Sequence, residues 1–579
     1  MTAKRRVAAI GLGLAGAILL AYLPVLGNGF VNFDDYAYLW DGSLVRDGLS
    51  ARGLVWAFTT THAGNWHPLT WLSHMADVQA FGMDARWHHG ASLALHAANA
   101  VLLFLGLRSL TGATRASAVV AALFGLHPLH VEAVAWTSER KELLCTFFWL
   151  LAAGAYVRQV RRPRPFGGVP AFALLALALL AKPMAVTAPL VFLLLDFWPL
   201  GRLAGLAQGN PRGQRVTRLL LEKAPLFALA GAAAIVTYLV QSGSGAIRSM
   251  ERLPLGLRVA NAAVSTAGYA LQALLPRDLA VFYPHPMGGL DFGKALAAAV
   301  ALAAVTALVL ARARRAPHLA WGWCLFLVTL APVIGIVQAG GQGMADRYTY
   351  VPLTGLFVAA VWGVRGLPGR APAAGRLLAP AVAAALLGCA ALTWRQASYW
   401  RDSVTLYERA LAVTPPSWIV VNSLATAWYE RGDLARAERQ YRRALGLQPR
   451  SPESLVSLGI ILARTGRVQE ADGYFQAAML ADPKYPKARL NYGLALAWKG
   501  RGAEALVQLR EAVRLDAAYA EGRLALGTAL EAAGIAQEAS AQLREAFSRD
   551  PGLIARKGEY EQLLRRAFPR RDDGGVPAP

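Results

Sequence analysis

Residues 486–519 read PKARLNYGLALAWKGRGAEALVQLREAVRLDAAY, and residues 520–553 repeat the same pattern. The period of 34 recurs in the prolines of the C-terminal third, which stand at Pro415, Pro449, Pro483 and Pro551. Ala517 occupies the step of this series that lacks a proline. A fixed period of about 20–50 residues is typical of proteins built from stacked repeats. The last third of the chain is therefore predicted to be a repeat array.

Other columns keep the same phase. Alanines recur at 437, 471, 505 and 539 and again at 410, 444, 478, 512 and 546, and an aromatic or leucine column runs through Tyr407, Tyr441, Phe475, Leu509 and Leu543. Small side chains let two helices approach closely, the larger side chain fills the gap to the next repeat, and proline ends the second helix. This combination is the tetratricopeptide pattern.

The columns also give the boundaries of the array. We expect four full repeats at 418–451, 452–485, 486–519 and 520–553. A half-repeat at 400–415 precedes them, a capping helix at about 554–568 follows, and the tail 569–579 is expected to be disordered. The predicted domains are accordingly a transmembrane module over 1–395 and a repeat domain over 396–568.

Composition assigns the first two thirds to a membrane. The chain has 579 residues, of which 55% are hydrophobic and 16% charged, whereas a soluble domain is about 45–50% apolar and about 25% charged. The net charge of +23 is of the kind that cytoplasmic loops carry, so it does not indicate nucleic-acid binding. Three cysteines in apolar runs exclude a disulfide framework and a cysteine zinc site.

Eleven segments are apolar enough to be predicted as membrane spans. They lie at about 7–26, 90–108, 116–135, 143–158, 169–182, 185–200, 223–241, 293–311, 319–338, 349–364 and 377–394. The first lacks a signal-peptidase site, so we expect it to stay uncleaved with the N-terminus in the cytoplasm. The fold class is all-α: a polytopic membrane module followed by an α-solenoid.

The distribution of arginine and lysine sets the orientation. Loops predicted to lie inside are rich in these residues, whereas the loops 28–89 and 242–292 carry acids and aromatics and are predicted to lie outside. This holds only if the apolar stretch 258–276 does not cross, so we expect an interfacial or re-entrant helix there. Eleven spans put the repeats outside the cytoplasm, in the periplasm if the host is Gram-negative.

Asp34 and Asp35 are the first candidate functional residues. They follow the first span closely, where charges are costly unless they are solvated or used. One carboxylate can act as a general base toward an acceptor hydroxyl. Taken alone, an Asp–Asp pair in a loop is more often a helix cap.

Cations and histidines supply the other candidates. Arg140 with its neighbour Lys141, Lys182 and Arg347 are predicted at the outer membrane surface, and Arg140 is the preferred residue of the first pair. Each could bind a lipid phosphate or simply pair with Glu139, Glu142 or Asp346. Eight of the ten histidines fall in 62–130 without a diagnostic metal-ligand spacing, so we favour hydrogen bonding and predict no metal. Tyr283-Pro-His285-Pro could line a cleft, and no nucleotide-binding motif is present.

The organisation as a whole resembles the transmembrane-and-tetratricopeptide O-mannosyltransferase-like proteins, a branch of the GT-C glycosyltransferases, in a bacterial version. The segments that carry the likeness are VNFDDY (31–36), NWHPLT (65–70), HPLHVE (127–132), AKP (181–183) and ADRYTY (345–350). The likeness covers nearly the whole chain. It departs from the family in one respect, since nothing here names a bacterial counterpart of the adhesion-type acceptors.

The resemblance implies a GT-C membrane module that uses a polyprenyl-phosphate-linked sugar as co-substrate and transfers it with inversion to a hydroxyl. Asp34 or Asp35 would act as the base, and Arg347, with Arg140 and Lys182 as weaker candidates, would contact the donor phosphate. The residues expected to line the site are His67, His130, Glu132, His285, Asp346 and Tyr348. No metal or other cofactor is expected. The partners would be a lipid-linked donor and a protein acceptor held by the repeats, with no nucleic acid.

Three alternatives stay open. The chain could be a non-enzymatic membrane anchor that presents repeats for envelope assembly. It could also be a GT-C enzyme whose acceptor is a glycolipid or polysaccharide. A transporter would predict an internal repeat of spans and ionisable groups at mid-membrane, neither of which is evident.

Overall fold

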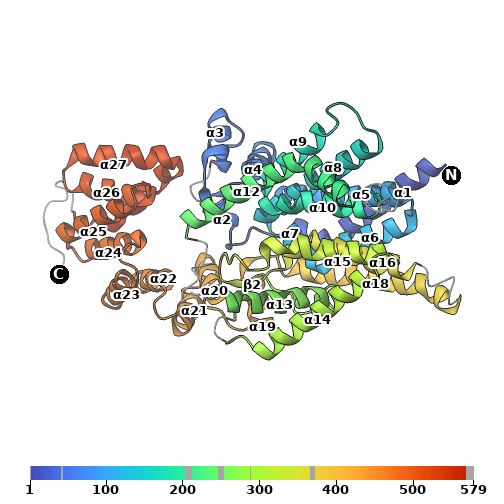
Figure 1. Cartoon of the computed structure of the whole chain (residues 1–579). Coiled ribbons are helices and arrows are strands. Elements are labelled where there is room, and N and C mark those ends of the chain that lie inside the picture. Colours follow the sequence, from blue (N-terminus) through green and yellow to red (C-terminus); the bar gives the residue numbers. More distant parts are fainter. Residues whose placement is uncertain are drawn as a thin grey trace. The chain divides into compact units, whose positions relative to one another are not determined.

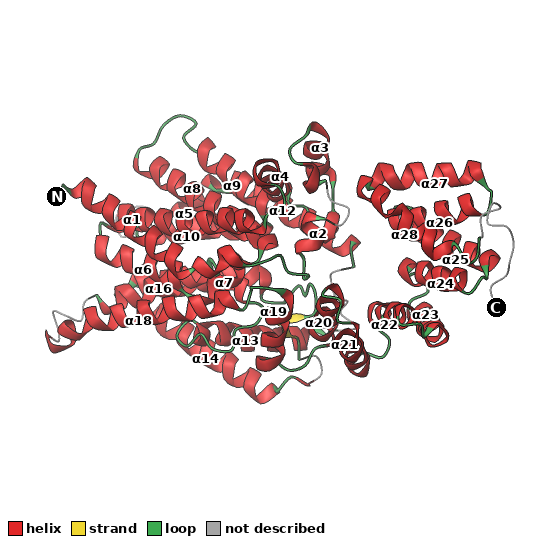
Figure 2. Ribbon diagram, turned by 180° about the vertical axis from the view of Figure 1, so that it is seen from behind, coloured by secondary structure: helices red, strands yellow, loops and turns green. Residues whose placement is uncertain are grey.

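The structure is a computed structural model, and it describes residues 2–40, 44–202, 212–245, 253–286, 289–365 and 372–568. The predicted disordered tail 569–579 lies outside the described residues. The chain divides into two compact units, Met1–Pro415 and Pro416–Pro579. Helices make up nearly all the regular structure of both (Figures 1 and 2). The all-α fold class is thereby confirmed.

The first unit runs from blue to yellow in Figure 1. Its helices are α1 (Ala3–Ala21), α2 (Asp35–Leu39), α3 (Ala51–Thr59), α4 (Pro68–Phe81), α5 (Ala85–Thr111), α6 (Thr114–Leu126), α7 (Val131–Ala135), α8 (Arg140–Arg161), α9 (Val169–Ala181), α10 (Ala188–Phe197), α11 (Arg212–Glu222), α12 (Ala224–Gly243), α13 (Leu255–Gln272), α14 (Phe292–Ala311), α15 (Pro317–Leu330), α16 (Pro352–Val364), α18 (Pro372–Ser398) and α19 (Ser403–Val413). The strands β1 (Tyr283–Pro284) and β2 (Gln342–Met344) pair antiparallel, with Tyr283 opposite Met344.

Five helical segments among the described residues are long and apolar enough to cross a membrane. They are Ala85–Thr111, Thr137–Arg161, Ala224–Gly243, Phe292–Ala311 and Leu377–Ser398. A sixth span would be the pair Thr114–Leu126 and Pro128–Ala135, which bends by 53°. Pro128 explains the bend, because proline lacks the N–H that would continue the helix. Four further apolar helices are shorter, so the count of eleven spans stays a prediction although each predicted span coincides with helix.

Helix α13 occupies most of the stretch 258–276 that we expect not to cross. It is not among the helices long and apolar enough to span. The residues that it buries include Arg258, Asn261, Ser265 and Thr266, and Asn261 and Ser265 both bond the carbonyl of Gly343 in β2. Its packed face is therefore polar and holds strand β2 of the β1–β2 pair.

Close helix packing in the first unit depends on small residues. Gly322 of α15 and Gly355 of α16 face each other so closely that a Cβ on either would overlap the other's carbonyl oxygen. Helix pairs in membranes commonly approach through such residues, because apolar burial against lipid tails provides no driving force there.

The second unit, orange to red in Figure 1, consists of helix pairs. They are α20 (Trp418–Glu430) with α21 (Leu434–Leu447), α22 (Pro452–Arg464) with α23 (Val468–Ala481), α24 (Pro486–Trp498) with α25 (Gly502–Leu515), and α26 (Ala520–Ala532) with α27 (Ala536–Arg549), followed by α28 (Lys557–Leu564). Each pair falls within one predicted 34-residue repeat.

The sequence columns have a direct structural reason. A Cβ at Gly459 of α22 would meet the ring of Phe475 of α23 at 2.5 Å, and Gly493 and Gly527 face Leu509 and Leu543 in the same way. The glycine of the first helix thus makes room for the large side chain of the second. This contact recurs every 34 residues and fixes the packing within each repeat.

The half-repeat helix α19 packs with the first compact unit, which ends at Pro415. Hydrogen bonds tie this region to the segment after α1: Gly29 N–H donates to Arg401 O at 2.9 Å, and Asn32 N–H donates to Ser403 Oγ at 3.0 Å. The segment has the repeat pattern but packs with the membrane module.

Candidate active site

Three segments that are distant in sequence meet in one buried cluster of charges. Glu132 comes from α7, Glu139 from the 3-10 turn Thr137–Glu139, and Lys141 and Glu142 from the first turn of α8. Lys182 lies between α9 and the 3-10 turn Pro183–Thr187, and Arg347 lies in the turn Asp346–Thr349 before α16. We call these six residues the acid–cation cluster.

Glu139 is the centre of the cluster and is 2% exposed. Its carboxylate lies 3.1 Å from Lys141 Nζ, 2.8 Å from Lys182 Nζ and 3.5 Å from Arg347 Nε. Lys182 Nζ also lies 2.8 Å from Glu142. Buried charges are tolerated when each has partners of opposite sign, so the cluster fixes the positions of all its members.

Arg347 is held from two sides. Its Nη1 pairs with Glu132, and its backbone N–H donates to the other Glu132 oxygen at 2.9 Å. Its guanidinium lies over the rings of Trp136 and Tyr348, at 5.2 and 4.9 Å from their centroids. The hydrogen bonds and ion pairs among the described residues use Nη1 and Nε but not Nη2.

The neighbours of Arg347 are equally well fixed. Asp346 accepts a hydrogen bond of 2.8 Å from the Tyr283 hydroxyl, and burial together with the charge of Glu132 raises the Asp346 pKa well above its ordinary value. The Tyr348 hydroxyl accepts a bond from Gln342 Nε2 at 3.0 Å. The strand pair β1–β2 therefore supports the segment that carries Arg347.

Asp34 and Asp35 have different surroundings. Asp35 is fully buried and accepts hydrogen bonds from Val31 N–H at 3.0 Å and from the Ser138 N–H and hydroxyl at 2.9 Å each. Burial raises its pKa to about 6, although these hydrogen bonds act in the opposite direction. Asp35 thus anchors the segment between α1 and α2 to the turn that carries Glu139.

Asp34 precedes α2 at the N-cap position, yet its side chain makes no capping hydrogen bond. Its half-buried carboxylate forms no hydrogen bond or ion pair with the residues that the structure describes. Burial raises its pKa, an effect that the positive charges of Lys141 and Arg347 oppose. Asp34 therefore presents an uncommitted carboxylate beside the acid–cation cluster.

The adjacent cations Arg140 and Lys141 face different neighbours. Lys141 joins the cluster, bonds the Tyr38 hydroxyl at 3.2 Å and lies over the Tyr38 ring. Arg140 pairs with Asp77 of α4 and donates to the carbonyl of His88 at 2.6 Å. Consecutive residues at the start of a helix are about 100° apart, so only one of the two can face the cluster.

The three predicted site histidines lie in separate places. His67 is buried near the cluster, and burial with the charges of Lys141 and Lys182 holds its pKa well below the ordinary value. His130 bonds Phe124 O at 2.7 Å and packs against the ring of Tyr350. His285 follows β1, where its backbone N–H bonds Gly341 O. Only His67 is linked to the cluster by its electrostatic neighbours.

Several cluster members were missed by the sequence reasoning. Glu139 and Glu142 were considered only as pairing partners of nearby cations, and Lys141 was passed over in favour of Arg140. One local signal was available: Glu139 and Glu142 are three residues apart, a spacing that places both on one face of a helical segment. The aromatic neighbours Tyr38 and Trp136 gave no comparable signal.

A group that could hold a metal lies on the other side of α8's first turn, around Arg140. Ligand atoms of His74, Asp77 and His88 all lie within 4.8 Å of one another. These residues come from α4 and α5 and are distinct from the acid–cation cluster.

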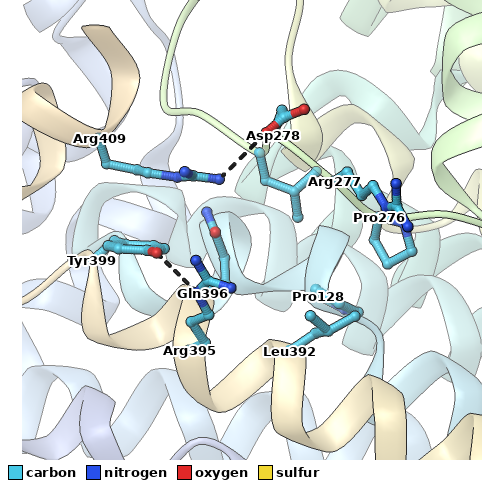
Figure 3. A pocket seen from close by; sticks show the side chains of 10 residues that line it. Pro128, Pro276, Arg277, Asp278, Leu392, Arg395, Gln396, Tyr399 and Arg409 are labelled. Atoms are coloured by element: carbon cyan, nitrogen blue, oxygen red, sulfur yellow. Dashed lines mark hydrogen bonds and ion pairs between the residues drawn. The ribbon is translucent and has the colours of Figure 1, made fainter. Parts of the chain in front are cut away.

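Figure 3 shows a further cavity of about 300 Å³, lined by residues other than those of the cluster. Arg277, Arg395 and Arg409 line it together with a single carboxylate, Asp278. Arg409 lies 3.9 Å from Asp278, and Arg395 Nε donates to the Tyr399 hydroxyl at 3.0 Å. The surplus of positive charge suits an anionic group.

Comparison with known proteins follows the division of the chain. A family model described as tetratricopeptide repeat matches residues 390–452, 424–486 and 456–520. A thermophilic tetratricopeptide-repeat protein of Thermus thermophilus is 24% identical, with 30% of this chain and 93% of that chain covered and a TM-score of 0.26.

Curated relatives are named protein O-mannosyl-transferases. Tmtc1 of Drosophila melanogaster is 35% identical over 204 residues, 33% of this chain and 23% of the relative. Tmtc2 of the same organism is 32% identical over 223 residues, which are 36% of this chain and 23% of the relative. Human TMTC1 is 30% identical over 207 residues, which are 32% of this chain and 23% of the relative. The chain thus spans less than a quarter of the length of these relatives. Together with the repeat match, they confirm its resemblance to the transmembrane-and-tetratricopeptide protein family.

Proposed function

We propose that this chain is a membrane-embedded glycosyltransferase that moves a sugar from a polyprenyl-phosphate-linked donor to a hydroxyl of a protein. The names of the curated relatives make mannose the first sugar to test and protein the first acceptor class. The apolar helices are consistent with a donor that resides in the membrane. The GT-C class, the bacterial inner membrane and the extracytoplasmic side belong to the same proposal.

The single observation that carries the proposal is the uncommitted carboxylate of Asp34 beside buried cations. A general base must be able to reach the proton that it removes and must not be occupied by other donors. Asp35, whose carboxylate accepts three hydrogen bonds, does not meet that condition. Asp34 is therefore the base in this proposal, and Asp35 is its positioning residue.

The donor phosphate has a matching site in the cluster. A leaving phosphate gains charge as its bond to the sugar breaks, and fixed cations stabilise that charge. Arg347 offers Nη2 while Glu132 and Glu139 hold the rest of its guanidinium in place. Lys182 and Lys141 support it through Glu139. Arg140 is left out because its contacts are with Asp77 and His88.

The reaction would then be a single inverting displacement. The acceptor oxygen forms a bond to the anomeric carbon while the bond from that carbon to the phosphate oxygen breaks. The proton of the acceptor hydroxyl passes to Asp34, and the bonding electron pair leaves with the polyprenyl phosphate. His67, Glu132, Asp346 and Tyr348 line or support this site in the proposal, which gives no role to His130 and His285.

The repeats would hold the acceptor. Tetratricopeptide arrays present a concave surface on which an extended peptide can lie. The four helix pairs of the second unit supply such an array. Tetratricopeptide repeats support protein binding in general. The experiment below is designed to identify the acceptor.

The test is transfer of radiolabelled sugar from synthetic polyprenyl-phosphate sugars to a periplasmic extract by the full chain in detergent. We expect Asp34→Asn to lower the rate by roughly 10²–10⁴-fold, the usual contribution of a general base. Asp47→Asn is the matched control, because Asp47 is an exposed carboxylate of the same outer loop. It should leave the rate unchanged.

The product decides among the alternatives. Labelled protein that disappears with Asp34→Asn supports the proposal in full. Labelled lipid or glycan would keep the enzyme and replace the acceptor. Absence of transfer from every donor, with the repeats still retaining a defined envelope protein, would establish the scaffold instead.

A further inference from the structure

Two histidines and a carboxylate converge where the helices α4 and α5 meet. His74 and Asp77 are three residues apart on α4, a spacing that puts both on one face of the helix. His88 lies in the first turns of α5, just after the connection Gly82–Asp84. His74 and His88 are fully buried and Asp77 is 9% exposed. Their ligand atoms lie within 4.8 Å of one another.

The hydrogen bonds of His88 leave a lone pair directed at this point. Its Nε2 lies 3.0 Å from the carbonyl oxygen of Gly82. A carbonyl only accepts, so a neutral His88 carries its proton on Nε2 and has a lone pair on Nδ1. Nδ1 lies 3.5 Å from Asp77 Oδ2, which is also an acceptor. Two acceptors that face each other across this distance call for a cation between them.

His74 adds the third donor atom. Neither of its ring nitrogens has a hydrogen-bond partner among the described residues, although the side chain is fully buried. Buried polar groups are nearly always paired, and a bound ion is one of the explanations for a group without a hydrogen-bond partner. A ring nitrogen of His74 coordinating the same cation as His88 Nδ1 and Asp77 would give partners to two of the three unpaired ring nitrogens, one on each histidine.

We propose that His74, Asp77 and His88 bind a first-row divalent metal ion, of which zinc is the first to test. Two imidazoles and one carboxylate are a ligand set that suits zinc and its neighbours in the series. Outer contacts orient these ligands in the way that metal sites require: Gly82 O holds His88, and Arg140 pairs with Asp77. The sequence had favoured hydrogen bonding for these histidines.

The site would also hold the start of α8. Arg140 bonds Asp77 on one side and the carbonyl of His88 on the other, with Ser92 Oγ at 3.3 Å from its Nε. A metal that joins α4 to α5 would therefore fix Arg140 at the start of α8, and with it the next residue, Lys141, which belongs to the acid–cation cluster. The role is structural and does not depend on the proposed transferase activity.

The experiment measures zinc in the full chain, purified in detergent with a tag free of histidine. After incubation with zinc alone and dialysis, the wild type should retain about one zinc ion per chain. His74→Phe and Asp77→Asn should retain none above background. The matched control is His89→Ala, because His89 is the adjacent, equally buried histidine and its Nε2 is directed to Gly29 O. It should retain the zinc.

X-ray absorption of the zinc-loaded wild type keeps the proposal testable if the variants fail to fold. We expect two imidazoles and oxygen in the coordination shell. A wild type that retains no zinc would overturn the proposal and leave a proton between His88 and Asp77. Zinc that persists in His74→Phe, or a coordination shell without imidazole, would also overturn it.

Discussion

Two of the networks among the described residues in which one glutamate pairs with several cations differ in burial. In the acid–cation cluster, the carboxylate of Glu139 lies 2.8–3.5 Å from side-chain nitrogens of Lys141, Lys182 and Arg347, and Glu139 is 2% exposed. In the repeats, Glu438 of α21 pairs with Arg442 at 2.8 Å and with Arg467 at 2.9 Å.

The second network lies in water. The side chains of Arg442 and Arg467 are 41% and 45% exposed, and that of Glu438 is 20% exposed. Exposed pairs contribute little because water competes for both partners and salt screens them. A buried network gains more from each pair but makes every member indispensable, since removal of one leaves an uncompensated charge. Ion pairs of similar length are therefore expected to differ in how much stability is lost when one partner is removed. The network with the larger expected loss, the acid–cation cluster, is the one at which the chemistry is proposed.

The largest expected effect is on the buried network. Glu139→Gln removes the charge that three cations share, so we expect a loss of about 3–5 kcal/mol in the free energy of unfolding of the first unit. Hydrogen exchange of the full chain in detergent, read on peptides covering residues 128–145, reports this loss locally. A change below about 1 kcal/mol would show that water enters the cluster and that its burial is not decisive.

The pH dependence of Asp35 sharpens the comparison. Its pKa is raised from 3.8 to about 6, so the folded state binds this proton more tightly than the unfolded state. The stabilisation is therefore complete below a pH of about 4 and is lost as the pH rises through about 6. Relative to wild type, Asp35→Asn should gain about 2 kcal/mol between pH 4 and pH 7. Thermal unfolding at both values measures it, and a difference independent of pH would contradict it.

The repeat unit could be predicted almost entirely, because its information is local and recurs every 34 residues. Gly459 and Phe475 stand 16 residues apart in sequence and in contact in space, and the same pair of columns recurs in the next two repeats. Such a contact can be inferred from the spacing of residues alone.

The cluster could be predicted only as a set of charges near span ends. Whether Arg140 or Lys141 faces it depends on where the turn Thr137–Glu139 gives way to α8, which no local pattern specifies. Asp34 and Asp35 can be told apart only from the fold, because the hydrogen bonds that occupy Asp35 come in part from Ser138, more than a hundred residues away. Pairings between distant segments depend on the packing of the whole unit and leave no periodic signal.

A smaller effect is expected in the repeats. Glu438→Gln removes one of the two glutamates that Arg442 and Arg467 share, the other being Glu470, and all of these groups can return to water. We expect a loss of about 1 kcal/mol or less, from hydrogen exchange of peptides covering residues 434–475. A loss as large as that for Glu139→Gln would show that the repeat network acts as a unit despite its exposure.

The smallest expected effect is the change with salt in the cost of Glu438→Gln. It tests whether burial is the reason that Glu139→Gln costs more than Glu438→Gln. Between about 0.1 M and 1 M sodium chloride the screening length falls from about 10 Å to about 3 Å. The cost of Glu438→Gln should then shrink to within a few tenths of a kcal/mol, because its partners are solvated. The cost of Glu139→Gln should persist, because ions do not enter between groups that are buried together. If both costs fell in parallel, burial would not be what distinguishes the two networks, and the uncommitted state of Asp34 would have to be explained without a water-poor cluster beside it.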